Sequence, residues 1–159
     1  AQERGLSVAG VLGMLICFNL IYAVFSGPLG AWSDRIGRKR LIIGGWLAYG
    51  LIYLGFAVAT SATQIWVIYA LYGLYYAAVE GTTKALVADL IPNEQRGTAY
   101  GFFNATQGLM ALPASVFAGV LWQGIGGWAG FGPTAPFIAG AGLALIASGL
   151  LAWRWRGKL

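Results

Sequence analysis

The sequence has no histidine and only one cysteine, Cys17. A single cysteine cannot form a disulfide within the chain, and without histidine a mixed Cys/His metal site is excluded. The sequence also lacks a Ser/His pair and a nucleotide-binding motif, so we expect no enzyme activity. We predict no metal ion and no cofactor for this protein.

Charged residues are scarce as well, at 9% of the 159 residues, whereas 58% are hydrophobic. An ordinary soluble domain carries roughly a quarter charged residues, so a lipid bilayer is the expected solvent for most of this chain. The ten basic and five acidic residues give a net charge of +5, and the basic ones lie in clusters between apolar runs. This pattern is typical of a membrane surface and argues against a nucleic-acid partner.

Five long apolar runs divide the chain, and each is long enough to cross a bilayer as a helix at about 1.5 Å per residue. We predict an all-α, polytopic membrane protein in which residues 1–159 form a single membrane domain with five transmembrane helices. The predicted spans are residues 6–30, 41–60, 65–91, 94–122 and 137–153. A basic loop is expected at residues 31–40 and a basic tail at residues 154–159.

Lysine and arginine gather at alternate connections, and this asymmetry predicts the orientation. Basic loops are retained in the cytoplasm. In a five-span topology the cluster at 31–40, the connection with Arg96 and the tail with Arg154 and Lys158 share one face, whereas the other face has Arg4 alone. We therefore expect a multi-pass protein of the cell (inner) membrane with its N-terminus outside and its C-terminus in the cytoplasm.

Polar side chains at helical spacing indicate which helix faces turn away from lipid. The spans at 6–30, 65–91 and 94–122 each carry such a stripe, whereas the other two show nothing comparable. We expect the first three to surround a polar space and the other two to stand against lipid. The predicted substrate-cavity residues are Asn19, Tyr22, Tyr72, Tyr76, Asn104 and Gln107.

Glu80 and Lys84 lie one helical turn apart near the middle of the span at 65–91. A bare charge near the bilayer centre costs about 2.5 to 3.5 kcal/mol, which favours a partner or a proton on Glu80. Lys84 can provide the partner at i+4. Two interpretations stay open: a proton-coupling site, as a proton-driven carrier requires, or a static buried ion pair that fixes helix packing.

The segment from Gly30 to Arg40 has the most specific pattern in the sequence: Gly, three residues, Asp-Arg, one residue, Gly-Arg-Lys. A generic basic cluster explains the positive charges but not the spacing of glycine and aspartate. The pattern resembles the cytoplasmic loop that major facilitator transporters carry between the second and third helices of each six-helix half. The motif residues are Gly30, Asp34, Arg35, Gly37, Arg38 and Lys39.

Residues 88–101 resemble the connection between the fourth and fifth helices of a half in the same family. The resemblance implies a cytoplasmic gate at Asp89, Glu94 and Arg96, and a partial six-helix half that lacks its first helix. The pair formed by Glu80 and Lys84 favours the C-terminal half, with the five spans as helices eight to twelve. An N-terminal half, helices two to six, is the alternative.

The family resemblance implies a part of a secondary active transporter that moves a small solute by alternating access, with protons as the candidate coupling ion. The expected partners are the solute, the lipid bilayer and the remaining helices of a longer parent transporter, because the chain begins without an initiator methionine. The alternative is a non-transporting membrane remnant or an assembly subunit.

Overall fold

The computed structural model describes residues 6–156, which form five long α-helices. The predictions for Arg4 and Lys158 lie outside these residues. The all-α prediction is confirmed. The helices are α1 (Val8–Ile36), α2 (Arg38–Val58), α3 (Ala62–Leu90), α4 (Arg96–Gln123) and α5 (Ala135–Arg154), with a short 3₁₀ turn at Asn93–Gln95 before α4.

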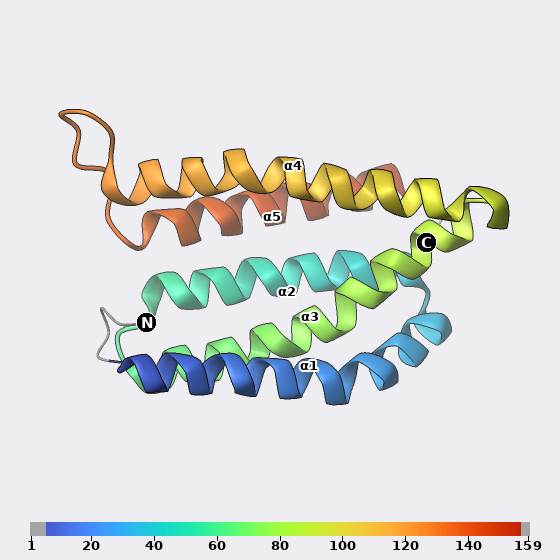
Figure 1. The fold of residues 1–159 in the computed structure, drawn as a ribbon, viewed down its shortest axis with the longest axis horizontal. Coiled ribbons are helices and arrows are strands. Elements are labelled where there is room, and N and C mark those ends of the chain that lie inside the picture. The colour runs from blue at the N-terminus through green and yellow to red at the C-terminus, as the bar shows by residue number, and fades with distance from the viewer. Residues whose placement is uncertain (1–5, 157–159) are drawn as a thin grey trace.

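The helices run alternately up and down, so that alternate connections meet at one end (Figure 1). The α1–α2 junction, the α3–α4 junction and the last turn of α5 lie together at what we call the basic end. Arg38 forms an ion pair with Asp89 there, and the Lys39 ammonium lies 5.5 Å from the ring centroid of Trp155. The basic clusters thus share one end, as the charge pattern predicted.

Four segments are long and apolar enough to cross a membrane, namely α1, α2, Asn93–Gln123 and α5. The chain is therefore a multi-pass membrane protein by the length and composition of its helices. α3 is as long as α1, at 29 residues, but it does not belong to this group. Its tyrosines and its charged residues lower its mean hydropathy, so the membrane span at residues 65–91 stays a prediction.

The segment at 31–40 differs from the predicted loop. α1 continues to Ile36 and α2 begins at Arg38, so that only Gly37, with φ of 94°, separates the two helices. Residues with a side chain rarely adopt this positive φ, which is why glycine is suited to the reversal of chain direction between α1 and α2. Apolar runs predict where lipid surrounds a helix, but the backbone hydrogen bonds continue into the polar residues beyond it.

Close helix contacts depend on small residues. α1 packs on α3, α3 on α2, and α2 on α5, so α2 lies between α3 and α5 (Figure 1). A Cβ added to Gly73 would lie 3.2 Å from the Phe18 carbonyl oxygen of α1, and one added to Gly50 would lie 3.0 Å from the Leu145 side chain of α5. Small residues therefore allow these helix backbones to approach one another closely.

α4 is the most loosely attached helix and has no buried residue. A Cβ added to Gly97 or Gly101 would meet nothing within 4 Å. Two hydrogen bonds join the first turns of α4 to α3: Arg96 Nε donates to the Ala88 carbonyl oxygen and Tyr100 Oη to the Lys84 carbonyl oxygen, each at 3.1 Å. Because α4 is so open, the division into cavity-lining and lipid-facing helices stays a prediction.

Candidate functional site

Glu80 and Lys84 form an ion pair on α3, with 2.8 Å between Lys84 Nζ and Glu80 Oε1. The spacing of four residues brings the two side chains to the same face of the helix. The Glu80 side chain is 35% exposed and that of Lys84 46% exposed, so the pair is only partly covered by the chain itself. The carboxylate has its partner, yet it stays within reach of water or of a proton.

The ion pair lines a cavity of about 200 Å³ between α2, α3 and α4. Tyr76 from α3 and Gln107 from α4 line the same space. Tyr22 of α1 lies beside this space, with its ring 6.3 Å from that of Tyr76. Three of the six predicted substrate-cavity residues, Tyr22, Tyr76 and Gln107, therefore lie near the ion pair.

The other three predicted cavity residues lie elsewhere. The Asn19 amide donates to the Leu15 carbonyl of its own helix at 2.8 Å, and Asn104 is exposed on α4. Tyr72 lines a different cavity, which does not include Glu80. A polar stripe predicts which face of one helix is turned away from lipid. Because neighbouring helices cross this face, its residues line more than one cavity.

α2 carries an aromatic stripe that was not predicted from its sequence. The α2 residues Trp46, Tyr49, Tyr53 and Phe56 follow one another at helical spacing. The rings of Tyr49 and Tyr53 have centroids 4.1 Å apart with their planes tilted by 30°, and the Tyr53 ring lies 6.3 Å from that of Tyr72 on α3. Tyrosine hydroxyls make the stripe on α3 polar, and Tyr49 and Tyr53 have the same effect on α2.

A second polar site, at the basic end, is organised by Arg38. Its guanidinium donates to Asp34 Oδ1 from Nη2 at 2.9 Å, pairs with Asp89, and donates to the Ala85 carbonyl at 2.6 Å. These contacts join the motif at the α1–α2 junction to the end of α3 within one chain. They surround a polar cavity of about 430 Å³ that Lys39 also lines.

The remaining motif and gate residues are arranged less tightly. A Cβ on Gly30 would meet nothing within 4 Å, and Arg35 and Glu94 are exposed. Arg96 donates to the backbone of α3. Of the three predicted gate residues, the structure therefore ties Asp89 and Arg96 to the α3 end, whereas Glu94 lies on the exposed 3₁₀ turn.

Replacing Arg38 by methionine is expected to lower the free energy of unfolding by about 1 to 2 kcal/mol, because two neighbouring carboxylates lose their shared cation. The estimate is below that for a fully buried pair, since Asp34 and Asp89 are 60% and 54% exposed. Thermal unfolding in detergent measures the loss. Arg40→Met, an exposed neighbour, is the matched control, and equal destabilisation by both changes would contradict the bridging role of Arg38.

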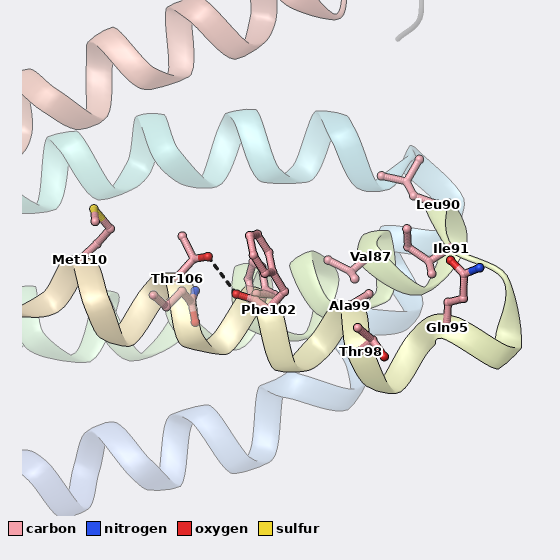
Figure 2. Close-up of a pocket in the computed structure, with 11 residues that line it drawn as sticks. Val87, Leu90, Ile91, Gln95, Thr98, Ala99, Phe102, Thr106 and Met110 are labelled. Carbon is pink, nitrogen blue, oxygen red and sulfur yellow. Dashed lines mark hydrogen bonds between the residues drawn. The ribbon is translucent and has the colours of Figure 1, made fainter.

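A large apolar hollow lies between the last turn of α3 and the first half of α4, with a volume of about 860 Å³. Figure 2 shows Leu90, Phe102 and Met110 around it. The Thr106 hydroxyl donates to the Phe102 carbonyl at 2.8 Å, so its donor is used within α4 (Figure 2). This space suits lipid or another helix better than a polar solute.

Comparison with known proteins agrees with the motifs that the structure joins through Arg38. The family description "Major Facilitator Superfamily" matches residues 1–158. The chain belongs to the major facilitator superfamily. This family comprises membrane transporters and not enzymes, as the sequence predicted.

The chain resembles several named members of the family. It is 42% identical over 140 residues to an uncharacterized MFS-type transporter of Methanocaldococcus jannaschii, which covers 88% of this chain and 33% of that protein. It is 33% identical over 151 residues to the class E tetracycline resistance protein of Escherichia coli, covering 89% of the chain and 34% of the relative. It is 30% identical over 128 residues to a Na⁺, Li⁺, K⁺/H⁺ antiporter of Planococcus maritimus, covering 77% and 30%.

The chain spans about a third of the length of these relatives. No solved structure shows significant similarity to it. The chain is thus comparable with one part of a major facilitator transporter.

Proposed function

We propose that the full-length protein is a proton-coupled secondary transporter of a small solute, and that this chain contributes helices eight to twelve of its C-terminal half. The observation that carries the proposal is the ion pair of Glu80 and Lys84 in the cavity between α2, α3 and α4. An ionisable pair within a membrane-spanning helix is costly unless it has a function or a fixed partner.

The proposed coupling step is a proton transfer to Glu80. A protonated Glu80 has no charge to pair with Lys84, so the ion pair opens and Lys84 must find another acceptor or turn toward water. Gln107 and Tyr76 line the same cavity and offer polar atoms there. Because Gln107 belongs to the loosely held α4, protonation of Glu80 is able to change how α4 rests on α3.

The same proposal includes the topology. α3 also crosses the membrane, which makes five spans in total, since it has the length of α1 and packs between α1 and α2. The basic end faces the cytoplasm, where basic residues are retained. The Asp34, Arg38 and Asp89 contacts then form a cytoplasmic latch, with Arg96 beside it.

Relatives support a coupled transporter. The relative from Planococcus maritimus is named as an antiporter of Na⁺, Li⁺ or K⁺ with H⁺, and a Bacillus subtilis relative is named multidrug resistance protein 2. By its name the first exchanges its substrate for protons. The solute of the present protein, and whether it is taken up or expelled, follow from a transport assay on the full-length protein.

Reconstitution into liposomes that contain a pH-sensitive dye tests the proposal. The full-length protein is expected to acidify or alkalinise the lumen when a gradient of its solute is applied, with Na⁺, K⁺, drugs and sugars as the panel. Solute flux without any pH change would contradict proton coupling. A protein that moves none of these solutes, yet associates stably with other membrane proteins, would favour the remnant or assembly subunit.

A further inference from the structure

An aromatic cavity lies toward the end of the bundle opposite the basic end. Its volume is about 240 Å³, and six aromatic residues line it: Tyr53, Phe56, Tyr69, Tyr72, Trp122 and Phe137. The rings come from four helices that pack against one another in the order α3, α2, α5 and α4. No residue that lines this cavity also lines the Glu80 cavity. Tyr72 precedes Glu80 by eight residues, or about 12 Å along α3.

The rings are inclined to one another rather than stacked. Tyr53 and Phe56 have centroids 6.4 Å apart with their planes at 83°, and Tyr53 and Tyr72 have centroids 6.3 Å apart at 61°. Tyr69 and Tyr72 are 5.9 Å apart at 54°. In such inclined pairs the edge of one ring meets part of its neighbour's face, and the ring surfaces that are left border the cavity. A ring face attracts a cation within about 6 Å of its centroid, and aromatic side chains line most of this cavity.

The remaining lining residues are Met14, Ile65, Pro133 and Thr134, so within residues 6–156 every residue that lines the cavity is uncharged. A metal ion would find no carboxylate to replace its water, and an anion would be repelled by the negative ring faces. A primary ammonium can donate to the tyrosine and threonine hydroxyls, but it is a compact and strongly hydrated charge that is costly to take out of water. A quaternary ammonium has no hydrogen-bond donor, and its methyl groups match the apolar walls.

We propose that this cavity binds a small quaternary ammonium ion through the faces of its tyrosine rings. Tyr53 and Tyr72 stand at the centre of the site, because each contacts rings of both α2 and α3. Thr134 and the tyrosine hydroxyls can bond a polar group elsewhere on the ligand. The site adds a ligand chemistry to the proposed transporter and does not require Glu80.

Binding of radiolabelled choline to the full-length protein tests the proposal. The protein is placed in nanodiscs of phosphatidylethanolamine and phosphatidylglycerol, since phosphatidylcholine carries the same ammonium group. Choline is expected to bind saturably. Its neutral isostere 3,3-dimethylbutan-1-ol should compete at least about tenfold more weakly, because it lacks the charge that the ring faces attract.

Three variants locate the site. Tyr72→Leu is expected to weaken choline binding by about tenfold, whereas Tyr72→Phe, which keeps the ring, should bind nearly as well as the unaltered protein. Phe25→Leu, on an exposed position of α1, is the matched control and should not change the affinity.

Three results would each overturn the site: no saturable choline binding, equal affinity for the isostere, or full binding by Tyr72→Leu. Equal affinity would mean that the cavity is simply an apolar space that lipid chains can fill. Binding is measured without any gradient, so failure here leaves the proton-coupling proposal to its own transport assay.

Discussion

Replacing Glu80 by glutamine is expected to reduce proton-driven transport by the full-length protein to the level of empty liposomes. Glutamine keeps the size and the hydrogen-bonding capacity of the side chain but cannot take up or release a proton. Solute counterflow, in which labelled and unlabelled solute exchange without net proton movement, should persist. Measuring both reactions on the same proteoliposomes separates a coupling defect from misfolding.

Two further variants decide between a proton site and a static ion pair. Glu80→Asp retains a titratable carboxyl and should retain proton-driven transport at a reduced rate. The exchange of both charges, Glu80→Lys with Lys84→Glu, retains an ion pair at i,i+4 but moves the carboxylate by about 6 Å along α3. We expect the exchange to remain inactive. Full proton-driven activity of the exchanged pair, or of Glu80→Gln, would leave only the static role.

Replacing Gly45 by alanine is expected to destabilise the protein by about 1 to 3 kcal/mol, the usual cost of forcing extra atoms into a packed interface. A Cβ built on Gly45 overlaps the side chain of Val79, which is only 6% exposed between α2 and α3. A β-branched side chain has little freedom to turn aside in a helix. The midpoint of thermal unfolding in detergent should fall accordingly.

Gly44 offers a matched control one position away. A Cβ there meets nothing within 4 Å, so Gly44→Ala should be neutral or slightly stabilising, by up to about 1 kcal/mol of helix propensity. Combining Gly45→Ala with Val79→Ala should restore part of the stability, because it removes the atoms that collide. Equal effects of the two glycine substitutions would show that the α2–α3 contact is less close than the structure has it.

Several features of the fold were predictable from the order of residues along the chain. The lengths of the apolar runs gave five helices, and the alternation of basic clusters placed Arg38, Arg96 and Arg154 at one end. Both follow from the bilayer, which fixes the length of a spanning helix and the side on which arginine is retained. The helix boundaries were predicted less accurately. The backbone hydrogen bonds of α1 continue past the apolar run to Ile36, and the helix ends there because Gly37 has a positive φ.

The candidate site was predicted only in part. Glu80 and Lys84 were paired correctly, because an i,i+4 spacing fixes the geometry within one helix. Contacts between helices were not predictable in this way. Arg38 reaches Asp89 across 51 positions of sequence, and Tyr72 and Tyr76, neighbours on one stripe of α3, line different cavities.

Local patterns in the sequence were enough to predict the class of the protein, its helices, the end at which its basic residues gather and its family motifs. Which residues share a cavity, such as Glu80 with Gln107 of α4 and Tyr72 with Tyr53 of α2, depends on how the helices pack. The reason is physical. Hydropathy and spacing describe one helix in its solvent, whereas a cavity depends on where glycines such as Gly45 and Gly73 let helices cross.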